Sequence, residues 1–347
     1  MFVLMDQLKK KHLMNKKVIM AFSGGVDSSV SALILKNKGY DVTAVYMRMI
    51  DSPVLEKRAK DLAKELNLPF LIFDFRKEFK NKIINYFIEE YKKGLTPNPC
   101  VLCNKEIKFG LFLKEANKIK ANFISSGHYV KVLKKEDGIH LYQAKDKLKD
   151  QSYFLWRLSQ KQLKNIIFPL NNYTKEEVIN IAKKNNLTSA KFKESQEVCF
   201  VKGINDDYLR KNIKSKKGNI VDKSGKILGS HNGIWFYTIG QRKGIGLSGG
   251  PYWVIDKKVK KNELVVSLKE EDLLKKEVKF KKVNWIIGKA PLFPIKVKAK
   301  IRYGHNPAYG ILNKNKIFFD KNQRSVTKGQ SIVFYKNKEV LGGGIII

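Results

Sequence analysis

The stretch 17-KVIMAFSGGVDSSVSALILKNKG-39 joins a short apolar run, a loop with two adjacent glycines and a segment that favours a helix. The apolar run predicts a buried strand. Gly24 and Gly25 allow the backbone to turn sharply and to approach a ligand closely. The helix would begin near Ser28 or Ser29, so its free N–H groups would point back at the loop. A loop of this kind, at the carboxyl end of a strand, predicts an anion-binding site.

The spacing of the two glycines separates this loop from the commoner nucleotide motifs. It contains neither GxxxxGK[ST], the P-loop pattern, nor GxGxxG, the dinucleotide pattern. For two glycines alone, a plain turn before a capped helix would be the simpler interpretation. The full hexad 23-SGGVDS-28 between a strand and a helix favours the anion site.

The rest of the first 200 residues alternates strand-like and helix-like segments. Apolar runs predict further strands at 42–47, 69–75 and 122–127. Apolar residues at helical spacing predict helices within 55–66 and 83–91, and 174-TKEE-177 is a capping box at the start of another. Strands that alternate with helices predict a parallel sheet with both faces covered.

After about residue 205 the chain changes character, because short strands bounded by glycines dominate. These strands are expected at 234–239, 252–256, 263–267, 295–303 and 331–335. The pattern predicts a small β-rich module such as a barrel. In 295–303 apolar residues alternate with lysines and Arg302, an arrangement typical of a strand with one solvated face.

Composition sets limits on the environment and on the partners. The 347 residues carry a formal net charge of +37, which favours a polyanionic partner such as nucleic acid. Of the 69 basic residues only eight are arginine, and the lysines spread over the whole chain, so biased codon usage is an alternative cause. Three cysteines in this length do not make a disulfide framework. With no signal-peptide pattern and no long apolar run, we expect a cytoplasmic protein without a membrane partner.

Here the loop supports a more specific interpretation. SGGVDSS resembles the signature of the PP-loop ATP pyrophosphatases, which cleave ATP between its α and β phosphates. These enzymes activate a carbonyl oxygen as an adenylate and let a nucleophile displace AMP. The resemblance implies ATP and Mg²⁺ as cofactors, but it leaves the nucleophile open.

The cysteines indicate sulfur as that nucleophile. The segment 96-TPNPCVLCNKEIKF-109 resembles the TPNPD-x-x-C-NxxIKF pattern of the tRNA-specific 2-thiouridylases of the MnmA type, and 194-ESQEVCFV-201 resembles their SQDxCF segment. Further matches follow in the family's order: 127-GHY-129, 149-KDQSYFLW-156, 238-TIGQRKGIG-246, 302-RYGH-305 and 329-GQSIVFY-335. The resemblance spans residues 17 to 335.

The resemblance implies a fold of class α/β plus β in three parts. These are a PP-loop, Rossmann-like ATPase domain with a parallel sheet at 1–205, a small central domain at 206–277 and a C-terminal β-barrel that contacts tRNA at 278–347. The implied activity is that of a tRNA uridine 2-sulfurtransferase that thiolates the wobble uridine of the tRNAs for Lys, Glu and Gln. The implied partners are tRNA and a sulfur donor protein, either a cysteine desulfurase or a sulfur relay.

Site residues are carried over position by position. Cys199 would carry the persulfide and Cys103 would act on it, releasing sulfide or forming a disulfide, because a thiolate is both a nucleophile and a sulfur acceptor. The residues expected to contact ATP are Ala21, Phe22, Ser23, Gly24, Gly25, Val26, Asp27, Ser28, Met47 and Gly127. Those expected to face the target base are Asn98, Pro99 and Cys100. Those expected to bind or position tRNA are His128, Lys149, Asp150, Gln151, Arg302, Tyr303 and Gln330.

One departure from the family pattern leaves the mechanism open. Cys100 stands where the family has an aspartate, so Cys100, Cys103 and Cys199 supply three thiolates. Three thiolates with one open coordination position could hold a 4Fe–4S cluster whose free iron binds a sulfide. A structural zinc site is less favoured, because it needs a fourth ligand and only His128 offers one. A persulfide route and a cluster route are therefore both hypotheses.

Two rival functions remain from the residues alone. The first is another PP-loop enzyme, such as a lysidine synthetase or an amidotransferase-type ligase, which would not need the cysteines. The second is an RNA-binding protein without catalysis, which the charge and the barrel would support but which would not need an intact phosphate loop.

Overall fold

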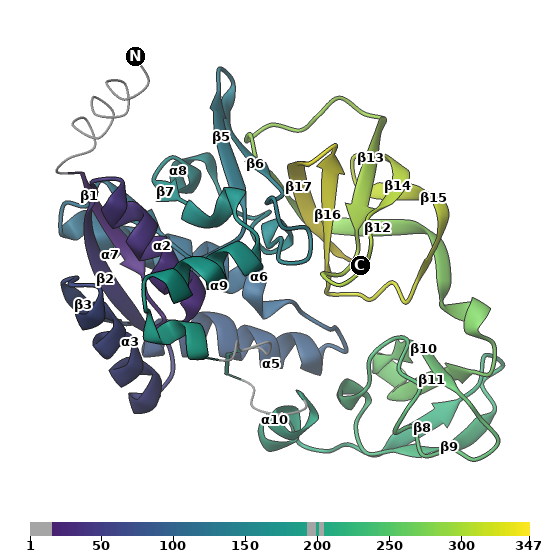
Figure 1. Cartoon of the computed structure of the whole chain (residues 1–347). Coiled ribbons are helices and arrows are strands. Elements are labelled where there is room, and N and C mark those ends of the chain that lie inside the picture. Colours follow the sequence, from purple (N-terminus) through teal and green to yellow (C-terminus); the bar gives the residue numbers. More distant parts are fainter. Residues whose placement is uncertain (1–15, 193–198, 201–204) are drawn as a thin grey trace.

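The computed structural model describes residues 16–192, 199–200 and 205–347 (Figure 1). The segment that begins the chain, 1–15, and most of the second cysteine motif, 193–198 with Val201, lie outside the described residues. In the described part, no helix is both long and apolar enough to cross a bilayer.

The first unit is built on a parallel sheet, as the alternation of strands and helices predicts. Its strands are β1 (Lys17–Ala21), β2 (Asp41–Arg48), β3 (Phe70–Asp74), β4 (Phe123–Ser125) and β7 (Ile166–Ile167). Their order in the sheet is β3–β2–β1–β4–β7, and every pairing is parallel. Alternate residues of β1 supply opposite faces, so Val18 and Met20 enter one hydrophobic cluster and Ile19 another.

Helices cover both faces of this sheet, which explains why β1 is apolar from Val18 to Ala21. One face packs against α2 (Val26–Asn37), α3 (Pro53–Glu65) and α9 (Lys175–Lys184). The other packs against the segment that runs through α4 (Arg76–Phe79), the π-helix η1 (Lys80–Ile84), α5 (Asn85–Lys92), α6 (Pro99–Cys103), the π-helix η2 (Asn104–Leu111) and α7 (Phe112–Lys118). The capping box at Thr174 is confirmed as the start of α9, since its hydroxyl accepts from Glu177 N–H.

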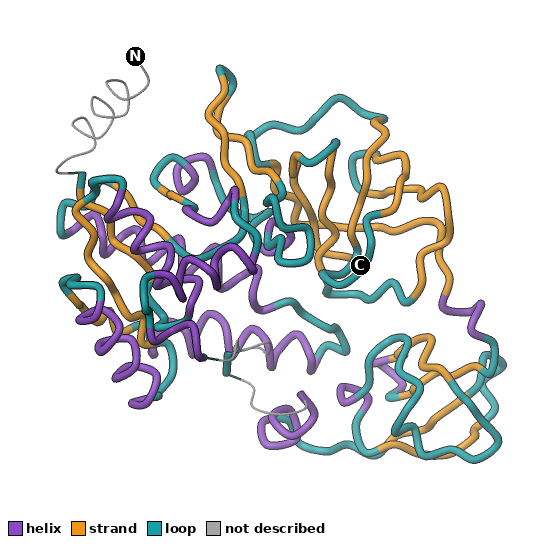
Figure 2. Tube along the Cα trace, in the orientation of Figure 1, coloured by secondary structure: helices purple, strands orange, loops and turns teal. Residues whose placement is uncertain are grey.

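The C-terminal unit is a closed barrel, as the β-rich pattern predicts. Its strands are β12 (Leu274–Trp285), β13 (Ile295–Lys300), β14 (Ala308–Leu312), β15 (Lys316–Arg324), β16 (Ser331–Lys336) and β17 (Glu339–Ile346). They follow the order β12–β15–β14–β13–β16–β17, and β12 pairs with β17 to close the ring. Figure 2 shows these strands gathered on one side and the helices on the other.

A hairpin from the first unit extends the barrel sheet. Strands β5 (Lys131–Lys135) and β6 (Gly138–Tyr142) pair with each other, and β6 pairs with β17. His140 is buried in this junction, with Nδ1 2.6 Å from Glu339 Oε1 and Nε2 2.7 Å from Asp137 Oδ1. The two units therefore share a sheet, although about 130 residues of chain separate the hairpin from β12.

The central unit is a second, smaller sheet. Its strands are β8 (Gly218–Val221), β9 (Ile227–His231), β10 (Trp253–Lys258) and β11 (Glu263–Ser267), in the order β10–β11–β8–β9, and α10 (Asn205–Asn212) precedes them. The shorter elements of the described chain are α8 (Gln160–Leu163) and the 3₁₀ turns η3 (Ser152–Phe154), η4 (Pro169–Asn172), η5 (Thr188–Lys191), η6 (Ile234–Phe236), η7 (Val259–Lys261) and η8 (Glu270–Leu273).

Two strand predictions need correction. The segment 234–239 is not a strand but the 3₁₀ turn η6 followed by a loop, and consecutive side chains pack on the same side where a strand would alternate them: Ile234, Trp235, Tyr237 and Ile239 all pack in or against the central core. Ile234 enters the central core, while Arg210 lies 4.3 Å from the centre of the Phe236 ring. The strand expected over 295–303 ends at Lys300, so Arg302 and Tyr303 lie in the turn that follows it. Short apolar runs do not distinguish these cases.

Candidate active site

The phosphate loop, residues 23–28, follows β1, the strand from which the chain builds the sheet outward in both directions. The chain proceeds outward from β1 to β2 and β3 on one side, and β4 and β7 lie on the other. Ligands of open α/β sheets bind outside the carboxyl ends of strands at such a switch point. The loop after β1 and the segment 126–128 after β4 flank it. This placement supports the anion site that the sequence predicts.

The backbone of the loop is shaped for close approach. Gly24 has φ +72°, and a Cβ there would lie 3.0 Å from the backbone of Ala59 in α3. Gly25 is the N-cap of α2, and its carbonyl accepts from the hydroxyls of Ser28 and Ser29 at 2.9 and 3.1 Å. Since no side chain caps α2, its first N–H groups remain available to an anion.

Gly127 closes the loop from the neighbouring strand. A Cβ at this position would lie 3.0 Å from the carbonyl carbon of Asp27 and 3.1 Å from Ser28 N. The predicted ATP contacts at 21–28 and Gly127 therefore come together at one place. Met47, in β2, packs partly buried against the core on the same sheet.

Asp27 of the loop is held by two side chains that the sequence analysis did not identify. Lys175 Nζ lies 2.8 Å from Asp27 Oδ1, and Tyr129 donates its hydroxyl to the same oxygen at 2.7 Å. Burial, with the Asp27 charge, raises the pKa of Tyr129, so the phenol stays protonated and acts as a donor. Lys175 is the first residue of α9, and the capping box predicts that position but not its partner.

The cysteine segment is a helix start. Asn98 is the N-cap of α6 and its side chain accepts from Val101 N–H at 3.4 Å, while Pro99 occupies the first turn. Cys100 is partly buried, Cys103 is buried and Cys199 is exposed, and all three are free thiols. Asn98, Pro99 and Cys100, the residues expected to face the target base, lie together at the N-terminus of α6.

The protein environment keeps the thiols protonated in this structure. Desolvation raises the pKa of Cys103 to about 12 and raises the pKa of the Cys100 and Cys199 thiols as well. Phe200, next to Cys199, packs against the hydrophobic cluster that contains Cys103, so the described end of the second cysteine motif lies on the same core as the first. A thiolate at Cys103 thus requires a change in its surroundings.

The ammonium group of Lys108 opposes the rise that desolvation causes in the pKa of the thiols. Its ammonium lowers the pKa of Cys100, Cys103 and Cys199, and it also lowers the pKa of His128. Lys108 lies five positions after Cys103. In an α-helix, which turns about 100° per residue, its side chain would therefore lie about 140° around the axis from Cys103. The i→i+5 bonding of the π-helix η2 instead brings Lys108 near the turn of Cys103. Only the quoted IKF match marks this lysine in the sequence.

The described donors do not fit the cluster hypothesis. Among the described His, Cys, Asp and Glu side chains, no group of three is arranged to hold a metal ion. Metal ligation also needs deprotonated thiols, which burial disfavours here. His128 does not complete a zinc site, since its Nδ1 lies 2.8 Å from the Ser126 hydroxyl and its ring packs against Phe109.

His128 itself is neutral near pH 7. Burial, with the Lys108 charge, lowers its pKa well below the usual range for histidine. Its expected contact with tRNA would therefore be a hydrogen bond and not an ion pair. Asn104, the first residue of η2, is buried, and its amide oxygen lacks a hydrogen-bond partner among the described residues.

The barrel reaches the cysteine segment through Gln330. Its side-chain amide donates to Thr96 O at 2.8 Å and to Pro97 O at 3.4 Å, and Thr96 N–H donates to Lys328 O at 2.9 Å. Gln330, expected to position tRNA, thus holds the loop that precedes Cys100. This contact joins residues 234 positions apart.

Of the other residues expected to contact tRNA, some lie at the surface and others form hydrogen bonds that hold neighbouring loops. Tyr303 is 37% exposed and packs on Phe154, with ring centres 4.5 Å apart. Arg302 donates to Ser325 O and Thr327 Oγ1. Lys149 is partly buried at the surface of its loop.

The side chains of Asp150 and Gln151 accept hydrogen bonds from backbone N–H groups of neighbouring segments. Asp150 is buried and accepts from Ala144 N–H and from Ser152 N–H and Oγ. Gln151 Oε1 accepts from Tyr129 N–H at 3.0 Å. If Asp150 contributes to RNA binding, it does so by fixing the loop around it.

Comparison with known proteins resolves the family. Models described as tRNA methyl transferase HUP domain, tRNA methyl transferase PRC-barrel domain and Aminomethyltransferase beta-barrel domain match residues 16–203, 206–268 and 275–346. The tRNA-specific 2-thiouridylase MnmA of Syntrophomonas wolfei subsp. wolfei is 44% identical over 338 residues, which cover 95% of this chain and 99% of that relative. The chain belongs to the MnmA-type tRNA-specific 2-thiouridylase family.

Another family member shows similar agreement. The tRNA-specific 2-thiouridylase MnmA of Clostridioides difficile is 44% identical over 358 residues, covering 96% of this chain and 98% of that protein. The descriptions of the family models refer to methyl transferases and aminomethyltransferases, whereas the two relatives are named as tRNA-specific 2-thiouridylases. The three-part fold seen here, with its parallel sheet, central sheet and closed barrel, is the one expected for the 2-thiouridylase family.

Proposed function

We propose that this enzyme uses ATP and Mg²⁺ to thiolate C2 of the wobble uridine in the tRNAs for Lys, Glu and Gln, releasing AMP and pyrophosphate. The observation that supports it best is that Cys103 and Phe200, the neighbour of Cys199, pack in one hydrophobic cluster against the parallel sheet whose switch point carries the phosphate loop. A methyl transferase or an ATP-dependent ligase would not need three thiols whose pKa values one lysine, Lys108, lowers.

In the first step the uridine O2 attacks the α-phosphate of ATP, and the bond to pyrophosphate breaks. The N–H groups of α2 and the backbone of Gly24 and Gly25 would cradle the phosphates, because they are the preorganised donors at this place. Asn98 and Pro99 at the start of α6 would hold the base. A wobble base is reached only when it is unstacked from its neighbours.

In the second step the terminal sulfur of a Cys199 persulfide attacks C2, and the C2–O bond breaks so that AMP leaves with its electron pair. The Cys103 thiolate then attacks Cys199 Sγ, and the bond to the transferred sulfur breaks with its electron pair kept on that sulfur. The products are 2-thiouridine and a Cys103–Cys199 disulfide, which a thiol reductant opens for the next cycle. Alternatively, Cys103 frees sulfide before the attack. A desulfurase or a sulfur relay would load the persulfide on the exposed Cys199.

Lys108 would assist by stabilising the negative sulfur. Burial makes the Cys103 thiolate unfavourable, and the Lys108 ammonium is the positive charge that opposes this effect. Binding of tRNA would displace the surroundings that keep Cys103 protonated. The buried thiol thus stays inactive until the substrate is present.

The deciding experiment measures the nucleosides of tRNA by mass spectrometry after incubation with MgATP and a persulfide donor. We expect 2-thiouridine at the wobble position, and its loss in Cys103→Ala and Cys199→Ala. Absence of 2-thiouridine from wild-type reactions with either a persulfide donor or a reconstituted iron–sulfur enzyme would refute the proposed function.

Cys100→Asp separates the two sulfur routes, because it restores the carboxylate of the family pattern. With a persulfide, we expect the variant to keep thiolation activity within about tenfold of wild type, since Cys100 carries no sulfur in that route. If sulfide came from a cluster on Cys100, Cys103 and Cys199, the variant would lose bound iron and activity together. Anaerobic iron and sulfide analysis of both proteins completes the comparison.

A further inference from the structure

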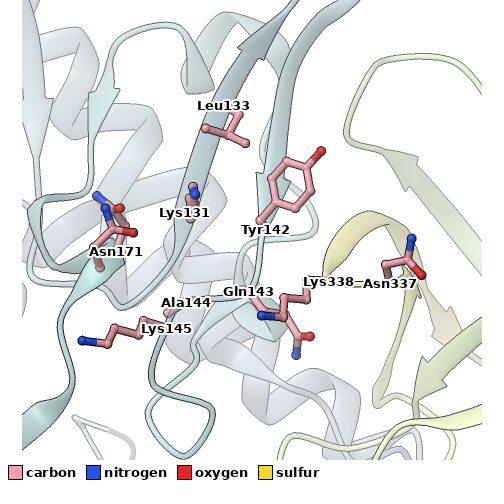
Figure 3. Close-up of a pocket in the computed structure, with 10 residues that line it drawn as sticks. Lys131, Leu133, Tyr142, Gln143, Ala144, Lys145, Asn171, Asn337 and Lys338 are labelled. Carbon is pink, nitrogen blue, oxygen red and sulfur yellow. The ribbon is translucent and has the colours of Figure 1, made fainter.

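A pocket of about 580 Å³ lies between the β5–β6 hairpin and the barrel, outside the site described above (Figure 3). Lys131 and Leu133 come from β5, Tyr142 ends β6, and Lys338 comes from the β16–β17 turn. Asn171 of η4 faces it from the opposite side. This volume is in the usual range for small-ligand sites, 300–1,000 Å³.

The walls of this hairpin pocket are tied together by backbone hydrogen bonds. Gln143 N–H donates to Lys338 O at 2.9 Å, and Lys145 N–H donates to Asn171 O at 3.1 Å. The hairpin, the barrel turn and η4 are thereby fixed relative to one another. A site assembled in this way is preformed, so a ligand would not have to order it.

The charge of the lining is positive. Lys131, Lys145 and Lys338 line the pocket, and among the described lining residues none is acidic. Carboxylates nearby already have partners, since Glu339 bonds to His140 and Tyr142, and Lys145 pairs with Glu177. Within the described chain, Lys131 and Lys338 form no ion pair. The pocket therefore offers two ammonium groups to an anion.

The pocket is continuous with the expected RNA-binding loop and with the phosphate loop. Ala144 N–H and Gln143 Nε2 donate to Asp150, which anchors the segment 149–151. Two residues further, Asp146 accepts from the N–H of Lys175, whose ammonium bonds to Asp27. One short segment, 143–146, is thus shared by the pocket and the surroundings of the active site.

We infer that the hairpin pocket binds a backbone phosphate of the tRNA substrate through Lys131 and Lys338, with the adjoining ribose against Leu133 and Tyr142. The inference rests on the proposed function, since it assigns a contact surface to the same tRNA. Lysines contact phosphates without reading sequence, so this contact orients the RNA and does not select it. A free phosphate group has the same chemistry, and the test must distinguish it from tRNA.

The test compares Lys131→Gln/Lys338→Gln with a matched control, Lys134→Gln/Lys336→Gln. Lys134 lies on the opposite face of β5 by strand alternation, and Lys336 is an exposed residue of β16 outside the pocket. Binding of labelled tRNA is measured at several salt concentrations. Each lost phosphate contact reduces the slope of log K against log salt by about 0.7–0.9, which corresponds to about 5- to 8-fold in affinity at 0.1 M salt.

The pocket variant loses one phosphate contact, so we expect its tRNA affinity to fall about 5- to 8-fold at 0.1 M salt and the slope to decrease by about 0.7–0.9. We expect the turnover number at saturating tRNA to stay near the wild-type value, with the KM for tRNA raised. The tRNA affinity of the control variant should fall by a smaller factor. If the pocket variant and the control lose equal affinity and slope, the inference is overturned.

Two further arms separate the possible failures. Wild-type protein that fails to thiolate tRNA refutes the proposed function, whatever the pocket binds. Inorganic phosphate is titrated as the second arm. If the pocket variant loses phosphate binding but keeps the wild-type tRNA affinity and slope, the pocket is a site for a free anion and the tRNA assignment is wrong.

Discussion

Lys175→Met removes the ammonium that faces the phosphate loop. Lys175 Nζ lies 2.8 Å from Asp27 Oδ1, and the side chains of Lys175 and Asp27 are only 14% and 29% exposed. Water therefore replaces the lost partner poorly, and of the side chains in the described part of the chain only Tyr129 remains bonded to the Asp27 carboxylate. Hydrogen bonds to charged groups contribute about 1.5–3 kcal/mol. We expect the free energy of unfolding of the first unit to fall by about that amount.

The expected shift can be measured by thermal unfolding. At about 2–4 °C per kcal/mol for a unit of this size, the midpoint temperature should fall by about 3–12 °C. The matched control is Lys183→Met, an exposed lysine of the same helix, which should change the midpoint by less than about 2 °C, since surface substitutions stay within about 0.5 kcal/mol.

A double-mutant cycle isolates the pair. Asp27→Asn should be less destabilising when Lys175 is already Met, because the buried charge is then removed with its partner. We also expect the Kd for MgATP, measured by calorimetry, to rise about tenfold in Lys175→Met, equivalent to about 1.4 kcal/mol. A variant with wild-type midpoint temperature, no coupling to Asp27 and unchanged Kd would refute the reasoning.

Other predictions concern the thiols, the loop and the barrel junction. With a pKa of about 12, Cys103 is roughly one part in ten thousand thiolate at pH 8, so iodoacetamide should label it far more slowly than the exposed Cys199, and its rate should rise tenfold per pH unit up to about pH 12. Equal labelling of the two at pH 8, seen by peptide mass spectrometry, would contradict the burial argument. Gly127→Ala forces its Cβ to 3.0 Å from Asp27, and we expect a cost of about 1–3 kcal/mol in stability and weaker ATP binding by calorimetry; wild-type values for both would contradict it. His140→Ala leaves Glu339 without its 2.6 Å partner, and we expect the urea midpoint to drop by an amount equivalent to about 1.5–3 kcal/mol, whereas an unchanged midpoint would mean that the junction does not depend on this histidine.

The local structure of this protein follows closely from its sequence. The apolar run 18–22, the glycine pair and the helix former after them produce β1, the phosphate loop and α2 near the expected positions. The capping box at Thr174 starts α9 as predicted. These signals succeed because each depends on neighbours within one turn or one strand. The strand predictions at 234–239 and at the end of 295–303 are wrong, since an apolar run alone does not distinguish a strand from a turn whose side chains are buried.

Contacts between distant segments were decided by the tertiary structure alone. Lys175 reaches Asp27 across 148 positions, Gln330 reaches Thr96 across 234, and His140 reaches Glu339 across 199. No local pattern encodes such pairs, because each depends on how helices and strands pack and not on the conformation of either segment. The sequence by itself determined which residue types carry the chemistry: a phosphate loop and three cysteines. Only the packing decided that Cys103 is buried and its pKa raised, that Lys108 is the cation that acts on all three thiols, and that the barrel holds the loop before Cys100.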